Sequence, residues 1–142
     1  MNSDMSPGRI VGIDYGTKRV GMAIADPLRL FSQPVGTYSQ DEAIDVLVRI
    51  DAESGIEIIV IGWPLTEDGS TGIATVRVQQ YVNRLKKKFK RAVFILQDER
   101  YTTQRAKELI KEGGNPSLRK SGRQRIDTAA AGVILQEYLE EM

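Results

Sequence analysis

The sequence contains neither histidine nor cysteine. Imidazole general bases, thiolate nucleophiles and the usual zinc sites are therefore excluded. The chain also has no apolar run close to the roughly 18 residues that cross a membrane, and residues 1–8 lack the apolar core of a signal peptide. We therefore expect a cytoplasmic protein, with no membrane partner, whose chemistry depends on carboxylates, hydroxyls and cations.

A strong excess of either charge is missing as well. Twenty basic and nineteen acidic residues give a formal net charge of +1, so any surface that attracts a polyanion must be local. The length of 142 residues is typical of one domain that buries a core without disulfides or a structural metal. We expect a single domain over residues 1–142, with a flexible tail at residues 1–8.

Hydrophobic patterning predicts an α/β protein in which three strands precede alternating helices and strands. We expect strands at residues 9–14, 20–25, 35–38, 56–61 and 92–97. We expect helices from Ser39 or Asp41 to about Gly55, over 71–88, from Thr102 or Thr103 to 111, and over 126–140. Val48 and Val76 fall at apolar positions of the first two helices. A helix followed by a buried strand indicates a parallel crossover.

Carboxylates recur where the predicted strands end. Asp14 ends the first strand and Asp98-Glu99 ends the last, and ligands of open α/β sheets collect at the carboxyl ends of strands. Asp127 opens the final helix, in which the small residues 129–132 would allow a close approach to the sheet. Because strand side chains alternate between faces, only one of Asp98 and Glu99 is expected to face the site, and the pattern leaves open which one.

Three converging carboxylates would suit Mg²⁺ or Mn²⁺, which prefer oxygen ligands. Such ions activate water and stabilise a leaving oxygen in phosphodiester hydrolysis, without histidine or cysteine. Each acid also has a structural interpretation. Asp14 would serve as a hydrogen-bond acceptor in the hairpin turn, and Asp127 as a helix N-cap.

Cations accompany these acids in sequence. Lys18, Arg19 and Arg100 are candidate contacts for substrate phosphates, and the alternative is that they are solvated turn residues. A basic loop at residues 118–125 has the composition of a mobile polyanion-binding segment. Its candidate substrate contacts are Arg119, Lys120, Arg123 and Arg125.

Two further features have simpler explanations. The cations at residues 86–91 complement the dipole at the end of a predicted helix, although they would also extend a path for nucleic acid. Trp63, in a predicted loop at residues 62–69, would either stack on a base or anchor the loop by packing. We regard this loop as a candidate rim of the site.

Four motifs in order resemble the YqgF family, also called RuvX or Holliday-junction-resolvase-like proteins. They are Gly-Ile-Asp-Tyr-Gly-Thr-Lys-Arg-Val-Gly at 12–21, Gly-Trp-Pro-Leu at 62–65 with Gly69, Asp-Glu-Arg-Tyr-Thr-Thr at 98–103, and Asp-Thr-Ala-Ala at 127–130 followed by Ile134-Leu135. The resemblance covers nearly the whole chain. It implies a ribonuclease H-like fold: a five-stranded mixed sheet, its first three strands antiparallel, with helices on both faces.

The same resemblance implies an acidic, metal-dependent active site of Asp14, Glu99 and Asp127, and so favours Glu99 over Asp98. It implies a nuclease that trims the 5′ end of precursor 16S ribosomal RNA, or a resolvase that cuts branched DNA, and we favour the RNA. A maturation factor that binds RNA without cutting it is a further alternative, as is either a monomer or a homodimer. Ala25 and Trp63 depart from the family pattern, which affects contacts at the rim. An actin-like ATPase would need two lobes, more than this chain offers.

Overall fold

The computed structural model describes residues 7–64, 72–98 and 122–142, and only the backbone of residues 122–127. The elements are β1 (Arg9–Tyr15), β2 (Val20–Ala25), β3 (Ser32–Tyr38), α1 (Gln40–Ser54), β4 (Ile56–Trp63), α2 (Ile73–Lys88), β5 (Val93–Asp98) and α4 (Gly122–Glu141). The helix predicted up to residue 111 lies outside the described residues. No helix in the described part of the chain is both long and apolar enough to cross a bilayer.

The strands form one mixed sheet in the order β3-β2-β1-β4-β5. The strand β1 pairs antiparallel with β2, and β2 pairs antiparallel with β3. On its other side β1 pairs parallel with β4, which pairs parallel with β5. The predicted fold class is confirmed, and the carboxyl ends of β1, β4 and β5 share one edge of the sheet.

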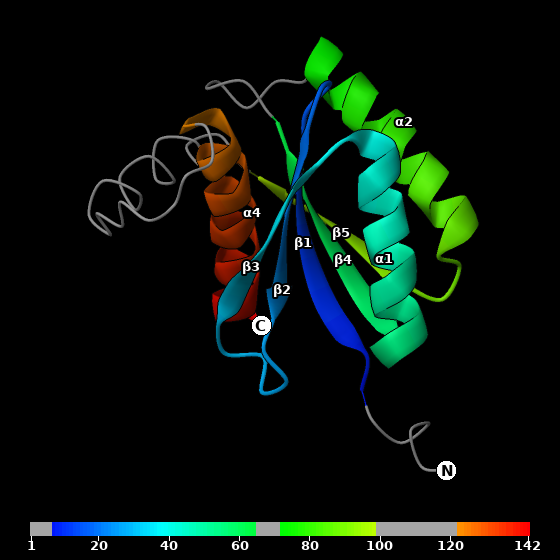
Figure 1. Ribbon diagram of the computed structural model, residues 1–142, viewed down its shortest axis with the longest axis vertical. Coiled ribbons are helices and arrows are strands. Elements are labelled where there is room, and N and C mark those ends of the chain that lie inside the picture. The colour runs from blue at the N-terminus through cyan, green and yellow to red at the C-terminus, as the bar shows by residue number, and fades with distance from the viewer. Residues whose placement is uncertain (1–6, 65–71, 99–121) are drawn as a thin grey trace.

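The helices cover the two faces unequally (Figure 1). Helices α1 and α2 lie on one face, which we call the α1/α2 face, and α4 lies on the other, the α4 face. The core of the α1/α2 face contains large side chains such as Ile13, Leu47 and Leu85. Among the described residues, the core of the α4 face is smaller and includes three alanines, Ala23, Ala25 and Ala131.

Two element boundaries differ from prediction by three residues or more. The strand β3 begins at Ser32 instead of residue 35 and includes Pro34, which the sheet accommodates because β3 is an edge strand and its pairing with β2 shifts register between Met22 and Ala23. The last helix begins at Gly122 instead of residue 126.

Two apolar positions assigned to helix faces are exposed. Val48 is 40% exposed and Val76 is 56% exposed. The buried side of α1 is instead formed by Ala43, Ile44, Val46 and Leu47. Apolar side chains at the margin of a helix face commonly remain in solvent, because there is too little polar surface to cover a folded protein.

The start of α1 is specified by a capping box. Ser39, and not Asp41, is the N-cap: its side chain accepts from the backbone N–H of Glu42, and the Glu42 carboxylate accepts from the N–H of Ser39. These hydrogen bonds lower the pKa of Glu42. The first turn of α1 is therefore held firmly where β3 ends, next to the hairpin that joins β1 and β2.

Candidate active site

Asp14 lies at the carboxyl edge of the sheet between two glycines. It is half-buried and pairs with Gly21 of β2. On the other side, Ile13 pairs with Ile61, so the next residue of β4, Gly62, lies beside Asp14. Neither neighbouring strand therefore carries a side chain at the level of Asp14.

The alternation of β1 places Asp14 on the α4 face. Val11 and Ile13 pack in the core beneath α1 and α2, whereas Ile10 packs in the core beneath α4. Gly12 is also on the α4 side, because a Cβ atom built there would lie 2.6 Å from the Cβ of Leu135. Asp14 follows Ile10 and Gly12 on the same face.

The helix α4 approaches β1 closely at Gly12. An added Cβ at Gly12 would lie 3.1 Å from the carbonyl oxygen of Ala131, in addition to its clash with Leu135. Only glycine therefore allows this helix to rest on the strand two residues before Asp14. Of the small residues 129–132 that predicted a close approach, Ala131 lies at this contact.

Polar contacts fix the direction of α4 across the sheet. Near the carboxyl edge, the hydroxyls of Thr37 and Thr128 form a hydrogen bond. Near the opposite edge, the N–H of Ser32 donates to Gln136 Oε1 at 2.9 Å. Thr37 pairs with Gly21, the partner of Asp14, so the Thr128 end of α4 lies at the edge where Asp14 lies. The backbone of residue 127 is next to Thr128 in this helix.

Asp98 is the last residue of β5. Phe94 packs against the core of the α1/α2 face and Ile95 against that of the α4 face. Gln97 shares the face of Ile95 and donates to Glu141 of α4 at 3.2 Å. Asp98 therefore lies on the face opposite to Asp14, although it is at the same edge.

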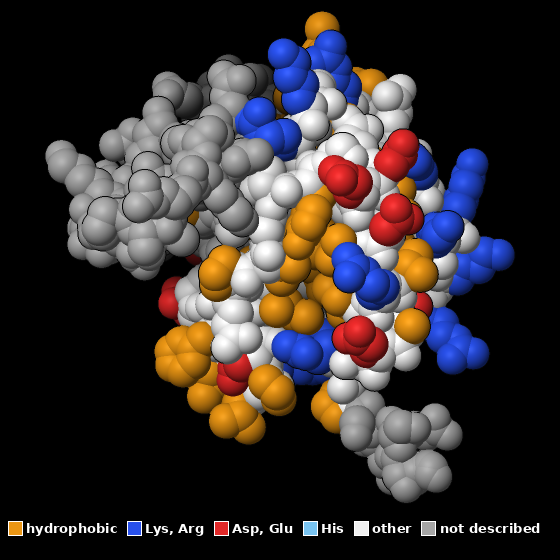
Figure 2. All heavy atoms as spheres, viewed as in Figure 1, with side chains coloured by type: hydrophobic (Ala, Val, Ile, Leu, Met, Phe, Trp, Pro, Cys, Tyr) orange, Lys and Arg blue, Asp and Glu red, His pale blue; other side chains and the backbone are white. Residues whose placement is uncertain are grey.

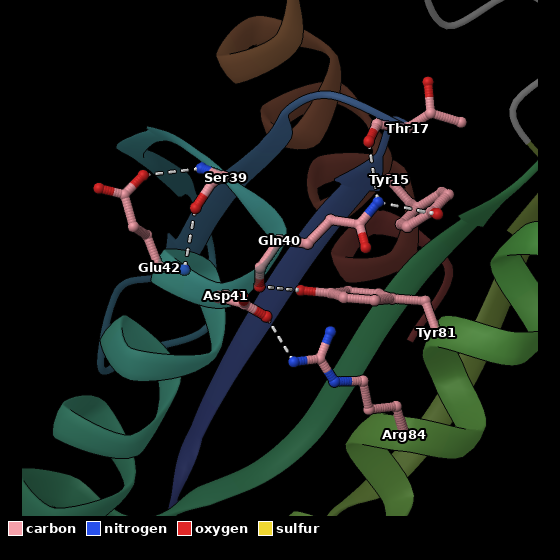
Figure 3. Close-up of polar contacts among 8 residues, drawn as sticks. All are labelled: Tyr15, Thr17, Ser39, Gln40, Asp41, Glu42, Tyr81 and Arg84. Atoms are coloured by element: carbon pink, nitrogen blue, oxygen red, sulfur yellow. Dashed lines mark hydrogen bonds and ion pairs between the residues drawn. The ribbon is translucent and has the colours of Figure 1, made fainter.

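The hairpin loop after Asp14 carries Lys18, which is exposed, and Arg19, which is half-buried. The loop is tight, because a Cβ at Gly16 would lie 2.6 Å from the carbonyl oxygen of Arg19. Gln40 holds this loop: its Nε2 donates to the Thr17 carbonyl oxygen at 2.9 Å and to the Tyr15 hydroxyl at 3.0 Å (Figure 3). The predicted hairpin connection is confirmed, and α1 fixes it in place.

The helix α2 supports the same loop through Tyr81. Its hydroxyl donates to the Gln40 carbonyl oxygen at 3.0 Å, and its ring lies 4.9 Å from the ring of Tyr15, centroid to centroid (Figure 3). Burial raises the pKa of Tyr81 to about 12, so the hydroxyl remains a donor at neutral pH. Gln40 was not predicted as a site residue, because nothing in its local sequence signals a contact with a loop more than twenty residues earlier.

The remaining predicted residues are placed as follows. Trp63 is the last residue of β4 and packs against the core of the α1/α2 face, as expected for an anchor. The other predicted site residues lie outside the described side chains: Glu99, Arg100, Arg119, Lys120, Arg123, Arg125 and Asp127. Among the side chains that are described, no three acids form a group able to hold a metal ion.

Comparison with known proteins identifies relatives over the full length of the chain. The family model described as "RuvX: Holliday junction resolvase" matches residues 8–141. A protein of Salinibacter ruber named "Putative pre-16S rRNA nuclease" is 50% identical over 139 residues, which cover 98% of this chain and 97% of the relative. A protein of Chlorobaculum tepidum with the same name is 37% identical over 138 residues, 97% of each chain.

Solved structures share the fold. The Fowlpox virus resolvase, solved with Holliday junction DNA, matches with a TM-score of 0.60 and 12% identity over 94% of this chain and 97% of that one. RuvC of T. thermophilus, also solved with a Holliday junction substrate, matches with a TM-score of 0.55 and 9% identity over 95% of both chains. The fold is therefore ribonuclease H-like, as the sequence motifs implied.

Proposed function

The chain belongs to the RuvX family of Holliday junction resolvases, and from that premise we propose that it is a divalent-metal-dependent nuclease that trims the 5′ end of precursor 16S rRNA. The observation that carries this proposal is the position of Asp14. Its carboxylate lies at the carboxyl edge of the sheet, between two glycines and on the face covered by α4. Open α/β sheets bind their ligands at such an edge.

Asp14, Glu99 and Asp127 would together hold Mg²⁺ or Mn²⁺. The donor set fits such an ion, because it consists of carboxylate oxygens only. Position 127 is one helical turn before Ala131, whose carbonyl oxygen lies next to Gly12, so it belongs to the side of α4 that rests on β1. Asp98 is on the wrong face for Asp14, and the alternation of a strand favours the following residue, Glu99. The bound ion would activate water and stabilise the leaving oxygen.

The cations of the chain would position the substrate. Lys18 and Arg19 follow Asp14 in a loop that Gln40 holds rigidly, so they are placed to contact phosphates on either side of the bond to be cut. Arg100 and the cations of the basic loop, Arg119, Lys120, Arg123 and Arg125, would contact the backbone farther along. A rigid loop reduces the entropy lost when the substrate binds.

A second candidate function is the cleavage of branched DNA. The description of the family model favours it directly, since it names a Holliday junction resolvase. The acids would act in the same way on either substrate, because both reactions hydrolyse a phosphodiester bond. The two functions differ in substrate shape, so a direct comparison of substrates separates them.

The test is cleavage of a precursor 16S rRNA fragment and a four-way DNA junction side by side, with Mg²⁺, with Mn²⁺ and with a chelator. We expect the RNA to be cut at its 5′ extension only when metal is present. The Asp14→Asn variant should lose at least about 100-fold in rate, because it lacks a direct metal ligand, and outer-shell partners alone are worth 10–100-fold. Its melting temperature should be unchanged.

The Asp98→Asn variant is the matched control, since Asp98 is at the same edge but on the opposite face. It should cleave at the wild-type rate. Cleavage by Asp14→Asn in the presence of chelator would refute the metal-dependent nuclease. RNA binding without any metal-dependent product would favour the maturation factor, and cleavage of the junction alone would favour the resolvase.

A further inference from the structure

Charge is strongly segregated along this nearly neutral chain. Residues 72–97, which include α2, carry seven of the twenty cations and no acid at all. The rest of the chain contains the other thirteen cations and all nineteen acids, so its formal net charge is −6. Figure 2 shows Lys and Arg side chains along the right side of the molecule, where Figure 1 places α2. The net charge of the chain therefore conceals a local field of one sign.

Four of these cations are exposed at the end of α2 and in the turn that follows it. We call Lys87, Lys88, Lys90 and Arg91 the α2 basic segment. Within the described part of the chain none of the four forms an ion pair. By contrast, Arg84 is paired with Asp41 of α1, and Lys86 Nζ lies 5.9 Å from the centroid of the Phe94 ring. The segment thus presents to solvent a charge that no described acid neutralises through an ion pair.

The helix dipole alone does not account for this segment. Cations near a helix C-terminus are favourable, but the effect fades within the last turn. Lys90 and Arg91 lie beyond the end of α2. Moreover, α1 and α4 have no basic residue in their last turns, and α4 ends with Glu140 and Glu141. Two of the three described helices therefore have no cation near their C-terminus to interact with the helix dipole.

The position of the segment gives it a defined relation to Asp14. Because α2 follows β4 and precedes β5, it begins at the carboxyl edge and ends at the opposite edge of the sheet. Tyr81 meets Gln40 and Tyr15 beside the hairpin that follows Asp14, and Lys88 is seven residues after Tyr81, a rise of about 10 Å. That rise alone corresponds to roughly three nucleotide steps at 3.4 Å, and α2 also covers the face opposite to Asp14. A nucleic acid cut at Asp14 would therefore need an extension that passes to the α1/α2 face to reach the segment.

Neighbouring charges restrict the direction of approach. On one side α2 borders α1, whose exposed Asp41, Glu42 and Asp45 would repel phosphates. On the other side Lys86 leans over Phe94, so the surface continues toward the edge strand β5. A polyanion is thus favoured along the β5 side of α2.

On the basis of the proposed nuclease function, we propose that the α2 basic segment is a second RNA-binding surface, which holds the phosphate backbone of the substrate away from the bond that is cut. Lysines suit this task, since they act as point charges that need no fixed phosphate geometry. The surface would favour long or structured RNA over short oligonucleotides. It would contribute to binding and not to the chemical step.

The test compares the full-length wild-type protein with the K87Q/K88Q/K90Q variant. Binding of a 5′-extended precursor 16S rRNA fragment, and of a six-nucleotide RNA that covers only the cleavage site, is measured with chelator at 50–200 mM salt. We expect about tenfold weaker binding of the long RNA and a salt slope reduced by about two, since each lost phosphate contact removes roughly 0.7–0.9. Binding and metal-dependent cleavage of the short RNA should be unchanged.

Two variants serve as controls. The K87R/K88R/K90R variant keeps the charge and should bind the long RNA like the wild type, which separates a loss of charge from a change in structure. Arg49→Gln removes an exposed cation from α1 and should leave the salt slope unchanged. Equal affinities and slopes for the wild type and the Gln variant would overturn the second surface, as would weakened binding in the Arg variant.

The outcomes also separate this proposal from the nuclease function on which it rests. If the wild type cuts both RNAs and the Gln variant loses no affinity, only the second surface is refuted. If the wild type cuts neither RNA, the nuclease function fails. A loss of affinity for a four-way DNA junction, with none for RNA, would overturn the assignment of RNA as the ligand.

Discussion

The two faces of the sheet are built from side chains of different size. On the α1/α2 face, two helices pack against Val, Ile, Leu and Met side chains, with Tyr81 and Phe89 among them. On the α4 face, the described residues give one helix that rests on Gly12 and a core in which three of eight buried members are alanines. Among these residues the first face has the larger core, whereas on the second face the backbone of a helix lies next to that of a strand.

We expect the two faces to contribute differently, one mainly to the stability of the fold and the other to the position of α4 relative to Asp14. Burial of large side chains is the main favourable term in folding, so the α1/α2 face should supply most of the stability. Close approach of α4 contributes less burial, but it brings the helix end that carries residue 127 to the edge where Asp14 lies. Substitutions on the two faces should therefore change different properties.

The largest loss of stability is expected from Leu47→Ala on the α1/α2 face. Leu47 is fully buried, so its truncation leaves a cavity and should lower the free energy of unfolding by about 2–5 kcal/mol. Chemical denaturation measures this loss. The adjacent Val48→Ala is the control, because Val48 is exposed and its truncation should cost less than about 0.5 kcal/mol. A similar cost for both variants would show that stability does not come from this face.

Gly12→Ala should act mainly on the α4 face and on activity. The added Cβ meets Leu135 and the backbone of Ala131, so α4 must shift, at a cost of about 1–3 kcal/mol. Cleavage should fall by more than the unfolded fraction explains, because the end of α4 moves relative to Asp14. Gly132→Ala is the control in the same helix, since the nearest described atom to its Cβ would be Ser32 Oγ, at an ordinary contact distance of 3.6 Å. It should be neutral or stabilising by up to about 1 kcal/mol. Full activity in Gly12→Ala would contradict the role of close approach.

The smallest effect is expected from Thr37→Val. The variant keeps the shape of the side chain but loses the hydrogen bond to Thr128, which should cost about 0.5–1.5 kcal/mol. Thermal denaturation measures the cost, and Thr37→Ser, which keeps the hydroxyl, should restore most of the stability. If the Val and Ser variants are equally stable, then the hydrogen bond between Thr37 and Thr128 does not contribute to the docking of α4.

Much of the fold was predictable from local sequence. The run at residues 56–61 is short, apolar and rich in β-branched side chains, which is typical of a buried strand. Ser39 and Glu42 form a capping box, which marks the start of a helix. The start of β3 was not predictable, because proline excludes a central strand but not an edge strand, and strand order is a property of the whole sheet. The exposure of Val48 was not predictable either, because helical spacing does not define how wide the buried face of a helix is.

The type of residue in the candidate site was predictable from the sequence, but the face of the sheet on which each residue lies was not. Asp14 was identified because it ends an apolar strand in a chain without histidine or cysteine. The face on which Asp98 lies follows from the packing of Phe94 and Ile95 on opposite faces of the sheet. Only the folded sheet shows that packing. The contact of Tyr81 with Gln40 joins positions 41 apart, and no local pattern encodes such a pairing.

The hydrogen bond between Ser32 and Gln136 joins positions 104 apart. Contacts between residues so far apart in sequence form slowly, because the entropy of closing the intervening chain is lost before the contact contributes favourable free energy. The hairpin of β1 and β2 is local and needs no such delay. In a refolding chain, therefore, helical and hairpin structure should precede the docking of α4, and Asp14 acquires its surroundings only at the last stage. On this order, the carboxylate of Asp14 would gain its contact with α4 only after the rest of the sheet has formed.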